Sequence, residues 1–413
     1  MPGVKRALIW AALFAAFLLC GADELMERAR QGDVASQEKL AAEFFFGKKR
    51  KGNLPLAYYW FRRAAKSGSA SANYNMGMCL LKGWGCKKNV AGAFRAFETA
   101  MDKGVKKAAV RYAEMLFGGV ETDIFEEEEL PEVPADPQRA MEMLRPLAEN
   151  DTEAMGLLAK MLYRDVEKNG RELRQVLKRY VERAADAESE LLLLYSACLR
   201  SGLGGGVPDA AAGAEILRRA AKKKHPDAIA QLAEMMLLGL GMPVNRSEAL
   251  KLYEEAVKLG SSRAKTDVAQ MKLAGVNMAH DPAGAFELLK EAAEKNYPPA
   301  LCKLGDCYEF GIGTEPDIRQ AMYNYHKAAE LGSRLAAYRL GEHYRDGKKV
   351  PANAAVAFYF FNRAANAGHP GAMREAGKAL LNGSGTERNE NKALELLRRA
   401  ASAGDREAAE LLR

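Results

Sequence analysis

The amino-acid sequence predicts an all-α protein, an α/α solenoid that winds as a right-handed superhelix of about ten 36-residue helix-turn-helix repeats. Three observations predict this class. A short motif recurs every 36 residues along most of the chain, and two glycine-containing landmarks recur in phase with it. The composition favours helices, with 48% hydrophobic and 28% charged residues and few prolines. A chain of 413 residues also exceeds what one hydrophobic core usually supports, which favours a repeat array.

Residues 1–22 are expected to be a secretory signal peptide. Lys5 and Arg6 form a basic start, an unbroken apolar run follows, and small residues occupy the positions that a signal peptidase reads. The run is too short for a comfortable membrane span, and no later apolar run is long enough to cross a bilayer. Lipidation at Cys20 is the less favoured alternative, because Leu19 stands where lipoprotein signals carry a small residue. The mature chain is therefore expected in the periplasm or outside the cell, with no transmembrane segment.

The motif that defines the period is a pair of small residues followed three positions later by glycine or a substitute. One clear copy is Ala64-Ala65-Lys-Ser-Gly68, and another is Ala328-Ala329-Glu-Leu-Gly332. The intervals between motif ends are 36, 36, 47 and 37 residues, and then 36 residues six times over. Chance does not produce such spacing. The motif ends fall at Gly32, Gly68, Gly104, Asp151, Glu188, Lys224, Gly260, Asn296, Gly332, Gly368 and Gly404.

Each repeat is expected to contain a first helix, a glycine turn and a second helix. Residues 299–310 carry apolar residues at helical spacing and end at Gly311-Ile-Gly313, since glycine adopts the left-handed conformation that a helix end needs. The second helix spans residues 317–331, with Asp317 as its N-cap. Small residues at the Ala-Ala and Leu304-Gly305 positions let neighbouring helices approach closely. Prolines suited to a first helical turn recur 72 residues apart, at Pro226, Pro298 and Pro370.

The repeats depart from this pattern in the middle of the chain. The array is expected to cover residues 23–404, with an insertion of about eleven residues inside 119–137 and a partial C-terminal capping helix at 405–413. Residues 164–171 are predicted to be a loop without the glycine turn. The insertion carries four consecutive glutamates, and insertions in solenoids often sit on a binding face. The candidate partner-binding residues are therefore Glu126, Glu127, Glu128 and Glu129.

The order of these landmarks resembles the Sel-1-like repeat family, a relative of the tetratricopeptide repeats. The segment from Ala321 to Gly332, Ala-Met-Tyr-Asn-Tyr-His-Lys-Ala-Ala-Glu-Leu-Gly, is a near-complete match to the second helix of that repeat. The resemblance covers essentially all of the mature chain. It implies a protein-protein interaction scaffold that binds a protein or peptide on a concave surface formed by the first helices.

Several function classes have little support in the sequence. The 59 basic and 54 acidic residues left after signal removal (61 − 2 basic, net charge +5) are interleaved, unlike the basic stripe of a nucleic-acid-binding protein. The five histidines are scattered without metal-ligand spacing. No Gly-x-Gly turn leads to the lysine of a phosphate loop. No catalytic, cofactor-binding or metal-binding residue is therefore predicted.

The cysteines fit packed positions better than a disulfide framework. Cys79, Cys198 and Cys307 each lie four residues before a turn glycine, in a slot that holds methionine in other repeats. Cys79 and Cys86 are the only plausible disulfide pair, and free thiols are the favoured alternative. Some cysteine-rich relatives bridge adjacent helices in every repeat, but the corresponding positions are not cysteine in this chain.

Two local patterns carry alternatives to the scaffold interpretation. Ser36-Gln-Glu-Lys39 has the Ser-x-x-Lys spacing of penicillin-recognising enzymes, and some secreted relatives are described as weak β-lactamases. The further motifs of such enzymes are missing. Aromatic runs at 58–61 and 358–361 are mostly expected in the core, with one or two rings reaching solvent as interface anchors. A structural protein that self-associates through its C-terminal end is the remaining alternative.

Overall fold

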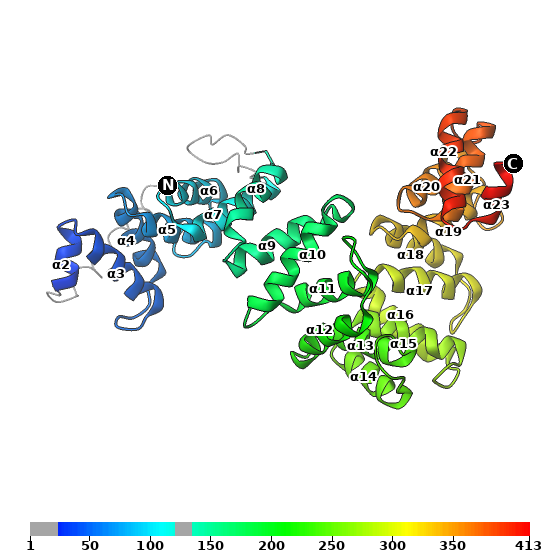
Figure 1. The fold of residues 1–413 in the computed structure, drawn as a ribbon, viewed down its shortest axis with the longest axis horizontal. Coiled ribbons are helices and arrows are strands. Elements are labelled where there is room, and N and C mark those ends of the chain that lie inside the picture. The colour runs from blue at the N-terminus through cyan, green and yellow to red at the C-terminus, as the bar shows by residue number, and fades with distance from the viewer. Residues whose placement is uncertain (1–23, 120–133) are drawn as a thin grey trace, which may run out of the picture. The chain divides into compact units, whose positions relative to one another are not determined.

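The computed structural model describes residues 24–119 and 134–413 of the chain. These residues form twenty-two helices joined by turns and short loops, and consecutive helices pack in pairs (Figure 1). This arrangement confirms the predicted all-α solenoid of repeats. The chain divides into two compact units between Pro208 and Asp209.

The first unit contains alternating first and second helices of the predicted repeats. The first helices are α3, α5, α7, α9 and α11, and the second helices are α4, α6, α8 and α10. Their bounds are α2 (Glu24–Arg30), α3 (Val34–Phe46), α4 (Leu54–Lys66), α5 (Ala70–Lys82), α6 (Val90–Asp102), α7 (Lys106–Gly118), α8 (Pro137–Leu147), α9 (Thr152–Tyr163), α10 (Val166–Arg183) and α11 (Ser189–Ser201).

The second unit continues the same alternation, with odd-numbered first helices and even-numbered second helices. Its helices are α12 (Ala210–Lys222), α13 (Pro226–Leu238), α14 (Arg246–Lys258), α15 (Ser262–Ala274), α16 (Pro282–Glu294), α17 (Pro298–Phe310), α18 (Ile318–Glu330), α19 (Arg334–Asp346), α20 (Ala354–Asn366), α21 (Pro370–Asn382), α22 (Glu390–Ser402) and α23 (Arg406–Leu411).

The helix ends repeat because the same chemistry ends each helix. Most first helices end at a glycine in the left-handed conformation, such as Gly311 with a φ of 68°. Most second helices begin at an asparagine or aspartate whose side chain accepts a backbone N–H of the first turn. Asp317 accepts from the backbone nitrogens of Arg319 and Gln320, which confirms its predicted role as an N-cap. Pro226, Pro298 and Pro370 stand at the first position of their helices, as predicted.

The core lies between the helices of each hairpin and between neighbouring hairpins. Within a hairpin, the glycine of the Leu-Gly landmark lies directly under a ring of the second helix. A Cβ atom at Gly305 would lie 2.5 Å from Tyr325, and one at Gly341 would lie 2.5 Å from Phe361. Only glycine permits this approach, so the landmark positions the ring.

The repeat with the insertion keeps the backbone hydrogen bond that joins the start of the second helix to the end of the first. In an ordinary repeat the N-cap nitrogen donates to a carbonyl oxygen nine residues earlier, as Asn89 does to Leu80 at 2.9 Å. Asp136 donates in the same way to Leu116 at 2.8 Å, which is twenty residues earlier. The eleven additional residues therefore occupy the connection between α7 and α8 without displacing the second helix. The candidate residues Glu126, Glu127, Glu128 and Glu129 lie outside the described residues, as do residues 1–22.

Two predictions about the central repeats were wrong. Residues 164–171 were expected to be a loop, but α10 begins at Val166 and continues for 18 residues. A helix forms here in place of the glycine turn, because its buried residues recur at helical spacing and can pack on one side. Asp151 and Glu188 were placed at motif ends, whereas they are the N-caps of α9 and α11. Lys224 does occupy a motif end and keeps the left-handed conformation there, with a φ of 56°.

Candidate functional site

The first helices of the second unit form one side-chain surface, which we call the first-helix face and define by α13, α15, α17, α19 and α21. Charged side chains cross this face from one repeat to the next. Arg263 on α15 contacts Glu234 on α13 at 2.7 Å, and Arg345 on α19 contacts Glu375 on α21 at 3.0 Å. The face therefore presents a row of polar groups and not an apolar stripe.

Two positions on this face change their charge from repeat to repeat. They contrast with the caps, glycines and alanines of the scaffold, which recur in register. A surface that changes while its support stays constant is able to recognise a specific partner. The first position holds Gln231, Asp267, Lys303, Arg339 and Glu375, and the second holds Glu234, Gln270, Asp306, Glu342 and Lys378.

A buried carboxylate links three segments in the middle of the face. Glu309 on α17 accepts hydrogen bonds from Tyr325 on α18 and from Lys349 in the loop after α19, both at 2.8 Å. Its other neighbour is His343 on α19, with 3.1 Å between the imidazole Nε2 and a carboxylate oxygen. Burial acts to raise the pKa of Glu309, but the hydrogen bonds from Lys349 and Tyr325 hold that pKa below its ordinary value. The ionised carboxylate of Glu309 therefore links two consecutive repeats, and we call this group of contacts the Glu309 joint.

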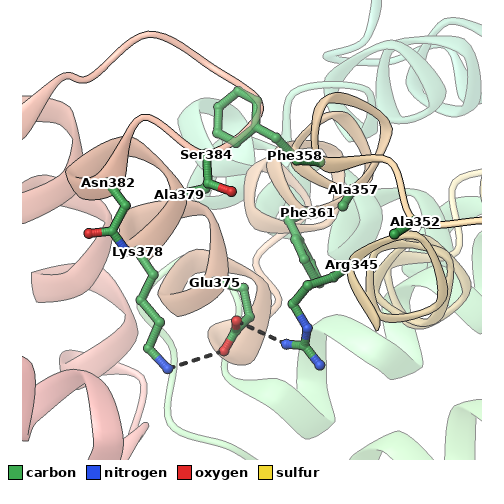
Figure 2. Close-up of a pocket in the computed structure, with 11 residues that line it drawn as sticks. Arg345, Ala352, Ala357, Phe358, Phe361, Glu375, Lys378, Ala379, Asn382 and Ser384 are labelled. Carbon is green, nitrogen blue, oxygen red and sulfur yellow. Dashed lines mark hydrogen bonds and ion pairs between the residues drawn. The ribbon is translucent and has the colours of Figure 1, made fainter. Parts of the chain in front are cut away.

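A pocket of about 320 Å³ opens one repeat further along the chain (Figure 2). It lies where the end of α19 and the following loop meet α20 and α21. Phe361 is 3% exposed and forms part of its apolar wall together with Ala357 and Ala379. Arg345 stands over the Phe361 ring at 5.8 Å from its centroid. The pocket thus joins an aromatic wall to a polar rim.

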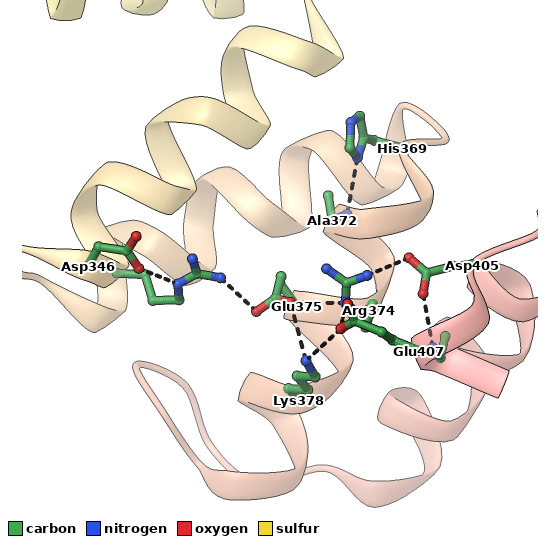
Figure 3. A network of polar contacts seen from close by, with 10 residues as sticks. Asp346, His369, Ala372, Arg374, Glu375, Lys378, Asp405 and Glu407 are labelled. Carbon is green, nitrogen blue, oxygen red and sulfur yellow. Dashed lines mark hydrogen bonds and ion pairs between the residues drawn. The ribbon is translucent and has the colours of Figure 1, made fainter. Parts of the chain in front are cut away.

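The polar rim belongs to a network that extends to α23 (Figure 3). Arg345, Arg374 and Lys378 all contact the carboxylate of Glu375, at 3.0, 3.0 and 3.4 Å. Arg374 also donates to Asp405, the N-cap of α23, at 2.8 Å. Burial acts to raise the pKa of Glu375, but its bond to Arg374 and the cations around it lower that pKa. The network keeps Glu375 ionised and fixes the rim in place.

The Ser-x-x-Lys pattern falls on the first turns of α3. Ser36 is 6% exposed, and its backbone nitrogen donates to the N-cap Asp33 at 2.9 Å. Hydrogen bonds from Ser36 lower the pKa of the Asp33 carboxyl group. Lys39 is exposed, and together with Asp33 and Ser36 it lines a shallow depression at the start of α3. Helix capping explains these contacts without any catalytic role.

The cysteines and the aromatic runs occupy packed positions. Cys79, Cys198 and Cys307 are at most 1% exposed, which confirms the predicted apolar slot. Cys79 and Cys86 are separate thiols, with Cys86 Sγ 3.4 Å from the carbonyl oxygen of Cys79. In each aromatic run the last two rings are buried, whereas Tyr359 is 57% exposed. The prediction of a mostly buried run with an occasional exposed ring is confirmed.

The described part of the chain shows neither a metal-binding cluster nor a helix that could span a membrane. Residues 24–119 and 134–413 contain no group of three or more His, Cys, Asp or Glu side chains that could hold a metal ion. Within the same residues, every helix is too short or too polar to cross a bilayer. Two histidines instead cap helices, since His225 and His369 accept backbone N–H groups at the starts of α13 and α21.

The pocket and the Glu309 joint were not predicted from the sequence. Glu309 and His343 are 34 residues apart and carry no motif, and Ala379 looks like any other helical alanine. A comparison of the repeats at matched positions is the one signal that could have found them.

Comparisons with known proteins agree with the geometry. A family model described as Sel1 repeat matches nine segments, at residues 34–69, 70–104, 106–151, 190–225, 226–261, 262–297, 298–333, 334–369 and 370–405. Residues 152–189, which contain the long α10, lie between two of these segments. A search of curated proteins finds no match.

Two solved structures align with most of this chain. A protective antigen present in uropathogenic Escherichia coli strains, displaying an SLR fold, aligns with a TM-score of 0.55 at 24% sequence identity, over 94% of this chain and 81% of its own. A Sel1 repeat protein from Oxalobacter formigenes aligns with a TM-score of 0.48 at 22% identity, over 97% of this chain and 92% of its own. At 24% identity, the alignment with the Escherichia coli antigen supports a shared fold and nothing further.

Proposed function

The chain belongs to the Sel1 repeat family, and from this premise we propose that it is a scaffold that binds a protein or peptide on its first-helix face. Proteins built from Sel1 repeats are generally interaction scaffolds without catalytic activity. One observation carries the proposal for this chain. The positions that change charge between repeats lie on this face, above a framework of helix caps and glycines that does not change.

The energetic argument favours recognition over stability as the role of these charges. Exposed ion pairs contribute only about 0–1 kcal/mol each to folding. Lys303 contacts Asp306 at 3.8 Å and Arg339 contacts Glu342 at 3.4 Å, and both pairs are partly open to solvent. Their main effect is therefore on which partner can approach, since charge patterns set specificity and association rate.

A pull-down from an envelope extract, with captured proteins identified by mass spectrometry, tests the proposal. The bait is the chain from residue 23 to 413. A variant with Lys303→Ala and Glu342→Ala removes two charges from the first-helix face. Its matched control carries Lys290→Ala and Glu395→Ala, which break comparable ion pairs on the second helices α16 and α22. We expect a specific partner that the first variant loses and the control retains.

Two results would contradict the proposal. Equal capture by both variants would place binding elsewhere, and capture of a second copy, with mass rising with concentration in light scattering, would favour the self-associating alternative. A further variant with Glu126, Glu127, Glu128 and Glu129 changed to serine tests the proposed contribution of the inserted loop.

We also propose that the protein acts in the periplasm or outside the cell. The support is the signal-like sequence of residues 1–22. Mass spectrometry of the protein recovered from an envelope fraction is expected to give a mature chain that begins near Asp23. A lipid mass on Cys20 would favour the anchored alternative, and an uncleaved cytoplasmic chain would contradict secretion.

A further inference from the structure

The pocket over Phe361 corresponds, one repeat earlier, to a space that a ring already fills. In the joint between α17, α18 and α19, the His343 imidazole stacks on Tyr325, with 5.9 Å between ring centroids and 29° between ring planes. Tyr325 is fully buried. Thirty-six residues later, Phe361 takes the place of Tyr325 and Ala379 takes the place of His343. The pocket therefore lies where a methyl group takes the place of the aromatic ring of the preceding repeat.

We propose that this pocket receives the aromatic side chain of an extended peptide segment of the partner protein. The proposal rests on the scaffold function above and names the kind of side chain that a site beside the first-helix face selects, between α19, α20 and α21. The chain itself supplies the template, since the same repeat geometry places a ring against a ring at His343 and Tyr325.

The size of the pocket fits one ring with part of its backbone. Its volume is about 320 Å³, whereas an engineered apolar cavity of about 150 Å³ is enough to bind benzene. The rings of Phe358 and Phe361 line the pocket, and aromatic pairs prefer offset or edge-to-face contacts. The Arg345 guanidinium, already placed over Phe361, adds a cation that can face the guest ring.

The rim favours a peptide over a free aromatic molecule. Asn382 and Ser384 are exposed at the mouth of the pocket and carry both donors and acceptors, which suits the amide groups of a peptide backbone (Figure 2). Glu375 is held by Arg345, Arg374 and Lys378, so the wall beside the ring is fixed before binding. A preorganised wall reduces the entropy lost when the ring enters.

The test measures binding of acetyl-Gly-Gly-X-Gly-Gly-amide peptides, with X as Phe, Tyr, Trp, Leu or Ala, to the chain from residue 23 to 413 by ligand-observed NMR. We expect the aromatic peptides to bind about tenfold or more tightly than the Ala peptide, and more tightly than the Leu peptide. Equal binding of the Leu and Phe peptides would overturn the proposal. Binding of phenylalanine amide alone, as strong as that of the Phe peptide, would overturn the peptide part of it.

Filling the pocket provides the decisive variant. Ala379→His introduces the residue that fills the matching space at His343, and we expect it to lower aromatic peptide binding by about tenfold or more. Ala367→His adds the same imidazole at an exposed position after α20 and is expected to leave binding unchanged. Ala379→Leu fills the pocket without charge and repeats the test if the histidine variant fails to fold. Unchanged peptide binding in a folded Ala379 variant would overturn the proposal.

The peptide-binding test and the pull-down can fail independently, so the pocket proposal and the scaffold proposal are tested separately. A partner that is captured equally by the parent chain and Ala379→His, together with no preference for aromatic peptides, leaves the scaffold function standing and removes the pocket proposal. Aromatic peptide binding that Ala379→His abolishes, with no protein captured from the extract, supports the pocket and counts against the scaffold proposal.

Discussion

Gly385 lies against the backbone of the preceding repeat with no room for a side chain, and it gives a sharp test of how the array is joined. Its φ is +72°, and a Cβ atom there would lie 2.1 Å from the carbonyl oxygen of Ala354, at the start of α20 one repeat earlier. No side chain can move aside, because the obstacle is backbone. The same contact recurs in the other glycine turns, between Gly85 and Leu54, Gly241 and Ala210, and Gly313 and Pro282.

Gly383, two residues earlier in the same turn, is the matched control. Its φ is +69°, but the nearest atom to a built Cβ is the carbonyl oxygen of Thr386, at 3.7 Å. Gly383→Ala therefore costs only the left-handed conformation, about 1–2 kcal/mol. Gly385→Ala carries the same cost and also forces two backbones apart, and overpacking of this kind adds about 1–3 kcal/mol. Together the two costs predict that Gly385→Ala destabilises the chain by about 2–5 kcal/mol.

Thermal and urea unfolding followed by far-UV circular dichroism measures both variants beside the parent chain. The midpoint of Gly385→Ala is expected to fall well below that of Gly383→Ala. Equal midpoints for the two variants would refute the reasoning, because they would mean that the backbone contact contributes nothing beyond the conformation of the turn.

Three further predictions concern single side chains. Lys224→Gly is expected to stabilise the chain by about 1 kcal/mol in thermal unfolding, because it relieves a left-handed lysine, whereas Lys223→Gly should destabilise it. Glu309→Gln is expected to cost about 2 kcal/mol in urea unfolding, since a buried charge-assisted joint is lost, whereas Glu342→Gln on a surface pair should cost less than about 1 kcal/mol. Burial, with Arg334 and Arg374 nearby, lowers the pKa of His369, so the unfolded chain takes up the proton first and stability is lost as the pH falls below about 6.5. His369→Asn keeps an N-cap without titrating and should reduce that pH dependence of the unfolding free energy; an unchanged slope would contradict it.

The sequence predicted the regular repeats well because their signals are local. A glycine with positive φ, an N-cap aspartate and a proline in the first turn each act within a few residues of themselves. Asp317 and Gly311 could therefore be placed without any knowledge of the neighbouring repeats. The structure puts both where the spacing predicted.

The central repeats were harder because substitutions there hide the register. Asp151 and Glu188 are N-caps, the position one residue after the motif end, so spacing alone places the register one residue too far along the chain. Lys224 keeps a glycine-like backbone without being glycine, and hydrogen bonds from the Lys224 nitrogen to the Ala221 oxygen at 2.8 Å and from the His225 nitrogen to the Ala220 oxygen at 3.3 Å close the helix end there. The start of α10 was missed because the prediction placed a loop after every first helix, including the one that lacks the glycine turn.

The period, most helix ends and the family could be read from the sequence, because each follows from residues that act locally and recur. The position of the pocket, in contrast, follows only from how the repeats pack. Ala379 is unremarkable in the sequence, and its importance comes from standing opposite Phe361 and Arg345, which belong to other helices. Space between stacked repeats depends on side chains about 18 and 34 residues apart in the chain. The pocket becomes visible only when the repeats are packed against one another.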